Sequence, residues 1–262
     1  MKMHENVGLG ETNIGYGGVN SVNVIEVETY EQLSEKASEI ILNLVKNNPC
    51  AKLGLATGST PLGTYKRLID DHRKNKTSYK HITTVNLDEY VGLDKNHPGS
   101  YRYYMNKELF SHINIKRENA HVPDGTAKDL DEECRSYEAM IEKLGGLDLQ
   151  LLGIGQNGHI GFNEPGTPFD SVTHVVELTE NTRQVNSRFF NSIDEVPTKA
   201  ITMGIASILK SKEILLLISG KQKSKALHRL LHGEISEDFP ASALKKHPNF
   251  TVIYDKEALK GV

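Results

Sequence analysis

The sequence predicts a single α/β domain built on a doubly wound, mostly parallel β-sheet with helices on both faces. From residue 24 onward, short β-rich runs alternate with longer segments whose apolar residues recur at helical spacing, which is the pattern of a parallel sheet covered by helices. The run at 214–218 is apolar throughout, as expected of a strand buried on both faces. The 262 residues show no internal repeat or linker after residue 23, so one core is the simplest interpretation.

The first strand is predicted at 24–27, and a helix follows it. Thr29 and Gln32 have the spacing of a capping box at the start of this helix. Pro49, which follows two asparagines, ends it. Its apolar stripe consists of Leu33, Ala37, Ile40, Ile41, Leu44 and Val45.

The remaining elements follow the same alternation. A strand at 53–56 leads to a helix whose first residue is Pro61, a position that tolerates proline. Ser100 is a predicted N-cap for a tyrosine-rich helix. The further predicted strands are 82–87, 147–152, 174–178, 200–203, 214–218 and 250–254. The further predicted helices are 130–144, 221–232 and 240–246.

Composition excludes several classes of partner. The 34 acidic residues nearly balance the 31 basic ones, which gives no electrostatic footprint for nucleic acid or a membrane surface. The longest apolar run, at 214–218, is far shorter than a membrane helix of roughly 20 residues. Cys50 and Cys134 form no C-x-x-C motif, as expected of reduced thiols. We therefore expect a cytoplasmic protein with no nucleic-acid or membrane partner.

The first 22 residues differ from the rest of the chain. They carry five glycines and show neither a periodic apolar pattern nor a signal-peptide core. We expect residues 1–22 to lie outside the fold, either as a disordered leader or as the product of a wrongly assigned start codon, with Val22 as one candidate for the true start. Residues 23–262 then form the single catalytic domain.

Gly153, Gly155 and Gly158 satisfy the dinucleotide fingerprint G-x-G-x-x-G directly after a predicted strand. A nucleotide site also requires a helix at this point, to hold the pyrophosphate at its N-terminus. Gly161 and Pro165 interrupt the chain instead. The segment is therefore expected to be a loop whose glycines let the backbone pass close to a small ligand, and a dehydrogenase is excluded.

The same loop carries titratable side chains at a strand's carboxyl end, where ligands of such folds bind. Asn157, His159 and Glu164 are candidate catalytic residues, because a neutral histidine oriented by a carboxylate transfers protons near pH 7. An isolated loop histidine is the alternative. No H-E-x-x-H or cysteine–histidine spacing completes a ligand set, so no metal is expected.

Asp88 is the second candidate acid–base residue. It follows the predicted strand at 82–87, where its carboxylate can face a substrate as a base. The alternative interpretation makes Asp88 and Glu89 solvated loop acids. The position at a strand end favours the catalytic role.

The loop at 57–60 is a candidate phosphate cradle, since a strand turns there directly into a helix whose N-terminus attracts anions. Thr64 stands where a nucleotide P-loop requires lysine. The alternative is that Ser59 and Thr60 merely cap the helix. The candidate phosphate ligands in this loop are Thr57, Gly58, Ser59 and Thr60.

Cationic partners for a phosphate come later in the chain. Arg183, Arg188, Lys221 and Lys223 all follow predicted elements. Lys223 is favoured because it lies just past the buried strand at 214–218, and Arg188 because two aromatic residues follow it. Arginine offers a bidentate fork and lysine a point charge for phosphate oxygens.

Five segments together resemble the glucosamine-6-phosphate deaminase family, over a region from about residue 24 almost to the C-terminus. The resemblance implies a Rossmann-like sugar-phosphate isomerase fold and a hydrolase of amino-sugar metabolism that converts glucosamine 6-phosphate and water to fructose 6-phosphate and ammonia without an organic cofactor. The segments are 53–61 (LGLATGSTP), 87–93 (LDEYVGL), 97–101 (HPGSY), 158–165 (GHIGFNEP) and 187–190 (SRFF).

The resemblance also implies roles. His159, supported by Glu164 and Asn157, opens the sugar ring. Asp88 moves a proton from C2 to C1 of the open-chain sugar. Arg188, Lys223 and the loop at 57–60 hold the phosphate, so that binding energy remote from the reacting carbons orients them.

Two departures from the family pattern carry information. Many members have aspartate in place of Asn157, so Glu164 is expected to carry most of the orientation of His159. Where allosterically activated members bind an effector with basic residues, this chain has His174 and Val176. We therefore expect no activation by N-acetylglucosamine 6-phosphate, no allosteric hexamer, and a monomer or small homo-oligomer.

Two alternative functions remain at this point. A 6-phosphogluconolactonase-like hydrolase resembles the family in fold and phosphate loop, but its chemistry needs no carbon-acid base such as Asp88. A non-catalytic sugar-phosphate sensor would carry a DNA-binding module and lose catalytic residues, whereas this chain keeps Asp88, His159 and Glu164.

Overall fold

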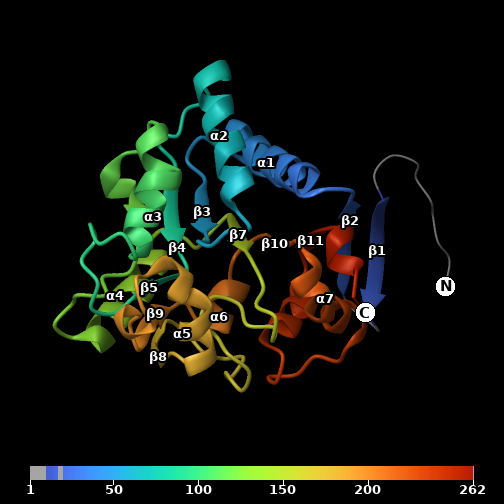
Figure 1. Ribbon diagram of the computed structural model, residues 1–262. Coiled ribbons are helices and arrows are strands. Elements are labelled where there is room, and N and C mark those ends of the chain that lie inside the picture. The colour runs from blue at the N-terminus through green and yellow to red at the C-terminus, as the bar shows by residue number, and fades with distance from the viewer. Residues whose placement is uncertain (1–9, 17–19, 262) are drawn as a thin grey trace.

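The computed structural model describes residues 10–16 and 20–261 (Figure 1). Its centre is an eight-stranded sheet in the order β1-β2-β11-β10-β7-β3-β4-β6, in which every neighbouring pair is parallel except β1 and β2. The strands in this order are β1 (Gly10–Tyr16), β2 (Asn20–Val27), β11 (Phe250–Asp255), β10 (Ile214–Ile218), β7 (Leu149–Leu152), β3 (Lys52–Leu55), β4 (Thr83–Asn86) and β6 (Ala120–His121).

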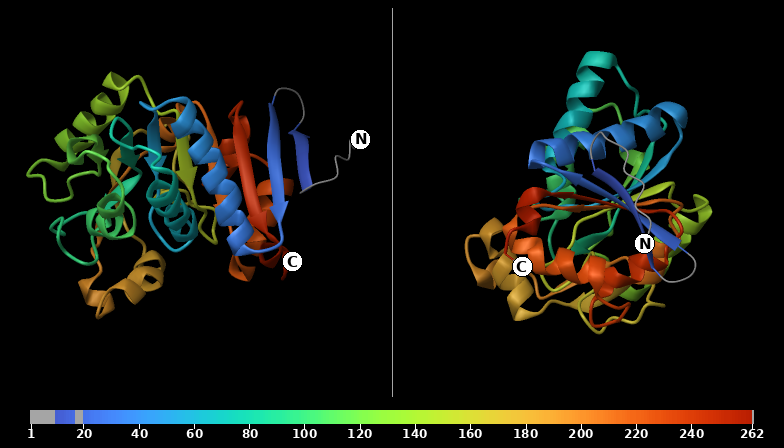
Figure 2. Two further views of the ribbon diagram at one scale, coloured as in Figure 1. Left: turned by 90° about the horizontal axis from the view of Figure 1, so that it is seen from above. Right: turned by 90° about the vertical axis from the view of Figure 1, so that its right-hand side faces the viewer.

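Helices cover both faces of this sheet, as the sequence predicts (Figures 1 and 2). In β10, Ile214, Leu216 and Ile218 belong to one apolar core, while Leu215 and Leu217 belong to the other; side chains alternate along a strand, so an all-apolar strand serves both faces. One face carries α1 (Tyr30–Asn47), α2 (Leu62–Asn75) and α3 (Tyr101–Glu108), and the other carries α4 (Leu130–Lys143), α6 (Ile205–Leu209) and α7 (Ser224–His232).

The helix starts follow local capping chemistry. The Thr29 hydroxyl accepts a hydrogen bond from the Gln32 amide, and the Gln32 side chain accepts one from the Glu28 amide, one residue earlier than a capping box requires. Ser100 caps α3 through the amide of Tyr103, as predicted. Helix α2 begins one residue later than expected, with Pro61 at the N-cap position. Sequence patterns therefore locate these starts to within one residue.

The expectation of a single sheet is wrong in one respect. The strands predicted at 174–178 and 200–203 exist as β8 (His174–Glu177) and β9 (Lys199–Thr202), but they form a separate antiparallel sheet with β5 (Asp88–Tyr90), in the order β5-β9-β8. Periodicity reveals a strand without revealing which sheet it joins. The chain therefore passes from β4 of the large sheet to β5 of the small one across a single residue, Leu87.

The remaining elements are short. The segment at 240–246 is a 3-10 helix where a helix was predicted, and the helix predicted at 221–232 begins with a 3-10 turn. The further helix is α5 (Glu180–Asn186), and the 3-10 helices are η1 (Phe110–His112), η2 (Arg117–Asn119), η3 (Ser187–Phe189), η4 (Ile193–Glu195), η5 (Lys221–Lys223), η6 (Pro240–Lys246) and η7 (Lys256–Leu259).

The structure also corrects the expectation for part of the leader. Gly10–Tyr16 forms β1, which pairs antiparallel with β2 from Gly10 opposite Glu26 to Tyr16 opposite Asn20. Strand β2 itself starts at Asn20, before the predicted boundary at residue 23. The segment 10–16 is short, contains two glycines and has no periodic apolar pattern, so sequence periodicity gives no indication of this strand. The part of the leader at 1–9 and 17–19 lies outside the described residues.

The topology places a binding site beyond the carboxyl ends of the central strands of the large sheet. From β3 the chain proceeds outward to β4 and β6 on one side, while β7 and β10 continue on the other, so the strand order reverses between β3 and β7. Ligands of doubly wound folds bind at such a reversal, beyond the carboxyl ends of the strands. Within the described part of the chain, no helix is long and apolar enough to cross a membrane.

Candidate active site

A cavity of about 1170 Å³ opens at the carboxyl ends of β4, β3, β7 and β10. It brings together nine of the ten residues that the sequence proposed, from segments up to 166 residues apart, and the tenth, Glu164, lies behind it in contact with Asn157. The nine are Thr57, Gly58, Ser59, Thr60, Asp88, Asn157, His159, Arg188 and Lys223.

Three tyrosine hydroxyls hold the loop at 56–60 from behind, and sequence analysis did not anticipate them. Tyr104 donates to the Gly58 carbonyl at 2.6 Å, and Tyr65 donates to the Ala56 carbonyl. Tyr30 donates to the Thr60 carbonyl at 2.9 Å and accepts from the Gly63 amide. Because hydrogen-bonded carbonyl oxygens present less negative charge to a ligand, this arrangement favours an anion in the loop. A tyrosine pattern is visible in the sequence, but its partner carbonyls are not.

The interpretation of Ser59 and Thr60 as simple helix caps is wrong. Pro61 is the N-cap of α2, and the Gly63 amide in its first turn donates to the Tyr30 hydroxyl rather than to Ser59 or Thr60. The hydroxyls of the loop are therefore available to a ligand at the positive end of a 14-residue helix.

Two cations complete the anion-binding end of the cavity. Lys223 lies in η5 just beyond β10, and its Nζ donates to the Ile154 carbonyl at 2.7 Å. Burial lowers the pKa of the Lys223 ammonium, and the charge of Arg188 lowers it further. A dianion between these two positive charges would offset their repulsion.

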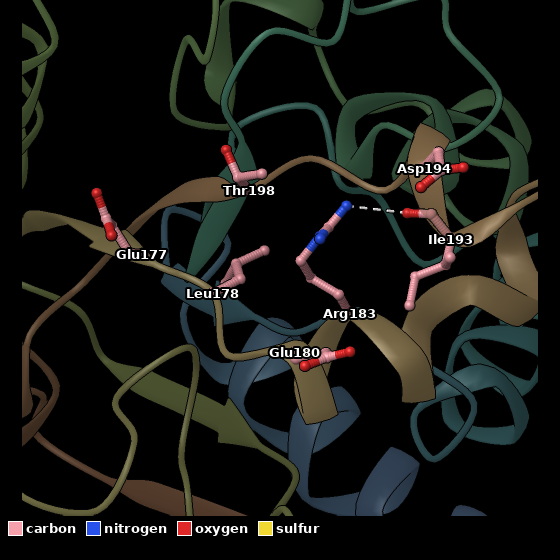
Figure 3. Close-up of a pocket in the computed structure, with 7 residues that line it drawn as sticks. All are labelled: Glu177, Leu178, Glu180, Arg183, Ile193, Asp194 and Thr198. Atoms are coloured by element: carbon pink, nitrogen blue, oxygen red, sulfur yellow. Dashed lines mark hydrogen bonds between the residues drawn. The ribbon is translucent and has the colours of Figure 1, made fainter.

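The other two candidate cations lie elsewhere. The Arg183 guanidinium donates to the carbonyls of Ile193 and Val196 at 3.0 Å, beside a separate pocket of about 440 Å³ on α5 (Figure 3). Lys221 is exposed and does not line the large cavity. Arg183 therefore fixes α5 to η4 and to the residue that follows it.

Asp88 and Glu89 are buried, at 7% and 3% exposure, so their interpretation as solvated loop acids is wrong. Burial raises the pKa of the Asp88 carboxyl to about 8, and the neighbouring Glu89 charge adds to the rise. The Glu89 carboxylate accepts hydrogen bonds from the amides of Tyr101 and Arg102 in the first turn of α3 and from Tyr90. Glu89 is thus a helix-capping anion, and Asp88 is a carboxyl group suited to proton transfer near neutral pH.

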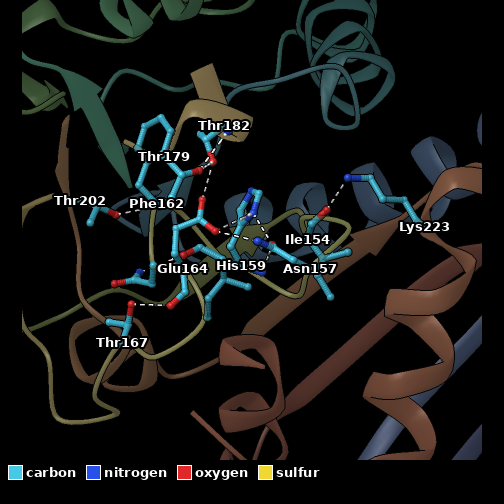
Figure 4. Close-up of polar contacts among 12 residues, drawn as sticks. Ile154, Asn157, His159, Phe162, Glu164, Thr167, Thr179, Thr182, Thr202 and Lys223 are labelled. Atoms are coloured by element: carbon cyan, nitrogen blue, oxygen red, sulfur yellow. Dashed lines mark hydrogen bonds and ion pairs between the residues drawn. The ribbon is translucent and has the colours of Figure 1, made fainter. Parts of the chain in front are cut away.

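His159, Asn157 and Glu164 form a linear hydrogen-bonded relay (Figure 4). The Asn157 amide nitrogen donates to Glu164 Oε2 at 2.8 Å, and His159 Nδ1 lies 2.8 Å from Asn157 Oδ1. A carboxylate only accepts, so the amide nitrogen faces Glu164 and the amide oxygen faces the imidazole. Nδ1 therefore carries the proton, and Nε2 is the unprotonated nitrogen.

The relay corrects one expectation. Glu164 Oε2 lies 3.8 Å from His159 Nδ1, too far for a hydrogen bond, so Asn157 directly orients the ring and Glu164 acts through it. Burial lowers the pKa of His159 and the Lys223 charge lowers it further, while Glu164 opposes the change. The imidazole is accordingly neutral at pH 7 and ready to accept a proton.

Two glycines of the 153–158 fingerprint serve the histidine and its loop. A Cβ on Gly155 would lie 2.1 Å from the His159 ring, so this position has no room for a side chain. Gly158 has a φ of +88°, and a Cβ there would strike Phe239. Whereas the sequence suggested close approach to a ligand, these glycines admit an imidazole and a phenyl ring.

The fold and cavity define a class of protein. A doubly wound sheet presents an anion-binding loop, two cations, a neutral histidine and a carboxyl group of raised pKa at one strand-order reversal. This combination is that of an α/β enzyme that carries out acid–base chemistry on a small phosphorylated substrate.

Comparison with known proteins specifies the family. Residues 26–253 match the family of glucosamine-6-phosphate isomerases and 6-phosphogluconolactonases, and the chain belongs to this family. It is 58% identical over 236 residues to glucosamine-6-phosphate deaminase of Geobacillus sp. strain WCH70, covering 90% of this chain and 94% of that protein. It is also 58% identical to glucosamine-6-phosphate deaminase 1 of Bacillus subtilis strain 168, over 90% of this chain and 97% of that protein.

Solved structures confirm the fold. A monomeric glucosamine-6-phosphate deaminase superimposes with a TM-score of 0.89 at 57% identity, covering 90% of this chain and 99% of that chain. The 6-phosphogluconolactonase of Thermotoga maritima superimposes with a TM-score of 0.71 at 22% identity, covering 89% of this chain and 99% of the other. The second likeness shows the shared fold alone.

Proposed function

We propose that this protein is a glucosamine-6-phosphate deaminase, which converts glucosamine 6-phosphate and water to fructose 6-phosphate and ammonia. The observation that carries the proposal is the presence of Asp88 and the His159 relay in one cavity with the loop at 57–60. The identity of 58% to two proteins of that name supports the same substrate. The family also includes lactonases, but lactone hydrolysis has no use for a carbon-acid base at Asp88.

In the proposed reaction, the phosphate binds to the loop at 57–60, Arg188 and Lys223. Charge-assisted hydrogen bonds to its oxygens would anchor C6, so that C1 and C2 lie toward Asp88 and His159. Arrival of the dianion would offset the charge of Arg188 that lowers the pKa of Lys223.

His159 would open the sugar ring. Its Nε2 lone pair takes the proton of the anomeric hydroxyl and returns it to the ring oxygen, which breaks the C1–O5 bond and forms the aldehyde. Asn157 keeps the Nδ1 proton in place during this exchange, because its oxygen cannot accept that proton permanently. The Glu164 carboxylate stabilises the transient imidazolium from 3.8 Å.

Asp88 would carry out the isomerisation. Its carboxylate removes the C2 proton of the open-chain aldose amine to give an enolamine, and the same proton is delivered to C1 to give the imine of fructose 6-phosphate. Water adds to the imine carbon and ammonia leaves, which balances the reaction. A base with a pKa near 8 is far stronger than an ordinary aspartate, which lowers the cost of removing a carbon-bound proton. These steps are proton transfers and hydrolysis, so no organic cofactor is required.

We further propose that the enzyme acts in the cytoplasm, as a monomer or small homo-oligomer, without activation by N-acetylglucosamine 6-phosphate. Cys50 and Cys134 are unpaired thiols, in keeping with a reducing compartment. Val176 has no charge for an effector phosphate, and His174 bonds the carbonyl of Val172 through Nδ1 at 2.7 Å. A hyperbolic rate curve, unchanged by the effector, is expected.

One assay tests the proposal. Purified protein is given glucosamine 6-phosphate, and fructose 6-phosphate and ammonia are measured separately through coupled enzymes. We expect both products in equal amounts. Hydrolysis of 6-phosphogluconolactone without ammonia release from the amino sugar would instead establish a lactonase, and failure of both reactions would favour a non-catalytic sensor.

A further inference from the structure

Thr182 connects α5 to the catalytic relay. It lies in the first turn of α5, its side chain is 6% exposed, and its hydroxyl donates to Glu164 Oε1 at 2.6 Å. The Thr179 hydroxyl, which caps the helix, donates in turn to the Thr182 oxygen at 3.0 Å. Figure 4 shows the Thr182 hydroxyl directed at the Glu164 carboxylate, with the Thr179 hydroxyl directed at Thr182. Glu164 is thus held between a helix and the histidine loop.

The two carboxylate oxygens of Glu164 have separate tasks. Oε1 receives the Thr182 proton, while Oε2 receives the Asn157 amide whose oxygen meets His159 Nδ1. The direction of these hydrogen bonds is fixed, because the Thr182 hydroxyl and the Asn157 amide both donate to the Glu164 carboxylate, which can only accept. The Thr182 hydroxyl therefore determines which face of the carboxylate is turned toward Asn157.

Helix α5 also leads to the anion-binding end of the cavity. It runs without interruption into η3, which carries Arg188. Arg183 fixes the same helix to the carbonyls of Ile193 and Val196. Thr182 is consequently the point at which the segment carrying a proposed phosphate ligand contacts the proposed proton relay.

We propose that Thr182 is a positioning residue for ring opening, which fixes the tautomer and orientation of His159 through Glu164 and Asn157 and aligns them with the segment that bears Arg188. The inference rests on the proposed function for its kinetic consequence. Its structural content, the state of the His159 ring, is independent of the substrate.

The decisive variant is Thr182→Val, which keeps the side-chain shape and removes the donor. We expect kcat for deamination to fall about 10-fold or more, since a hydrogen bond to an ionised group corresponds to roughly that factor. We expect KM to stay within about twofold, because the phosphate ligands are untouched. Thr182→Ser restores the hydroxyl and should recover most of kcat.

The chain offers a matched control. Thr173 is also 6% exposed, and its hydroxyl also donates to a carboxylate, that of Glu138 at 2.7 Å, outside the cavity. Thr173→Val removes the same kind of bond and should leave kcat unchanged after any change in thermal stability is accounted for. On a Glu164→Gln background, Thr182→Val should reduce kcat by less than about twofold further, because the relay is already altered.

The imidazole gives a readout without substrate. In ¹⁵N-labelled protein at neutral pH, His159 should show the Nδ1-protonated tautomer, and Thr182→Val should convert it to a mixture of tautomers. The inference would be overturned if Thr182→Val kept the native tautomer and the native kcat. It would also be overturned if Thr173→Val lost as much kcat as Thr182→Val, or if the kcat losses of Thr182→Val and Glu164→Gln were fully additive. If the unaltered protein releases no ammonia, the proposed function fails, while the tautomer comparison still decides the role of Thr182.

Discussion

The imidazole of His159 and the carboxylate of Glu164 lie 3.8 Å apart and are joined through the amide of Asn157. An amide inserted between the two conveys orientation without a second negative charge. The histidine therefore remains neutral, and its unprotonated Nε2 is available to accept a proton. The charge of Glu164 is still close enough to stabilise a passing imidazolium.

Asn157→Asp tests this arrangement. A carboxylate 2.8 Å from Nδ1 stabilises the imidazolium and should raise the pKa of His159, which burial lowers in the native protein. The acid limb of kcat/KM, below which the ring is protonated, should move about one unit higher in pH. NMR titration of the His159 ring provides an independent measurement, and an unchanged profile in both would contradict the relay described above.

Asp88→Asn should abolish ammonia release while leaving ring opening measurable, because the amide cannot accept the C2 proton. Exchange between the anomers of bound glucosamine 6-phosphate, followed by NMR, reports ring opening separately. The coupled ammonia assay reports the isomerisation. Simultaneous loss of both reactions in a folded variant would remove Asp88 from its assigned role.

The same substitution should change the pH dependence of stability. The pKa of Asp88 is about 8 in the folded protein and about 4 in the unfolded chain, so the folded state holds a proton that the unfolded state loses across this window. Stability from this group is complete below pH 4 and decreases as pH rises to 8. The Tm of Asp88→Asn should therefore rise relative to that of the native protein as the pH increases from 5 to 8. Asp170→Asn, at an exposed position, should give a curve parallel to the native one.

Tyr104→Phe should weaken substrate binding. The variant leaves the Gly58 carbonyl without its 2.6 Å hydrogen bond and lets the loop at 57–60 relax. KM should rise by roughly 3- to 10-fold, as expected for one neutral hydrogen bond of about 1 kcal/mol, with kcat less affected. Tyr103→Phe on the same helix is the control, because Tyr103 is 37% exposed and does not line the cavity. Equal KM values for the two variants would contradict the role of the tyrosines.

Lys223→Ala should raise KM about 10-fold or more through the loss of a charge-assisted phosphate contact. Lys221→Ala removes a like charge two residues away, at an exposed position outside the cavity, and should leave KM within about twofold. Rate measurements over a range of salt concentrations separate the direct contact from a general field effect, because only the latter is screened. A similar rise in KM in both variants would indicate a general electrostatic effect rather than a direct contact of Lys223 with the phosphate.

Local signals explain why much of the site could be predicted. Asp88 and His159 each follow a strand whose apolar pattern is readable, and parallel strands bring their carboxyl ends to one edge. Partnerships between distant segments have no such signal. Thr182 meets Glu164 across 18 residues, and Tyr104 meets Gly58 across 46, through the packing of helices on a sheet.

The errors in the fold have a similar cause. The β-rich run at 174–178 indicates a strand, but it does not show that this strand pairs with β9, which in turn pairs with β5, in a separate sheet. The strand at Gly10–Tyr16 pairs its backbone hydrogen-bonding groups with those of β2 at one edge of the large sheet. Such backbone pairing depends little on side-chain identity. The division between leader and catalytic domain stays a prediction.

Glu89 links the pKa of Asp88 to the stability of helix α3. The carboxylate that accepts from the first turn of α3 also carries the charge that adds to the rise in the pKa of its neighbour Asp88, which burial raises first. A substitution of Glu89 therefore changes the pH range of activity and also destabilises the start of α3. Optimising the base independently of the scaffold therefore requires changes at other positions, and selection acting on one property at residue 89 necessarily acts on both.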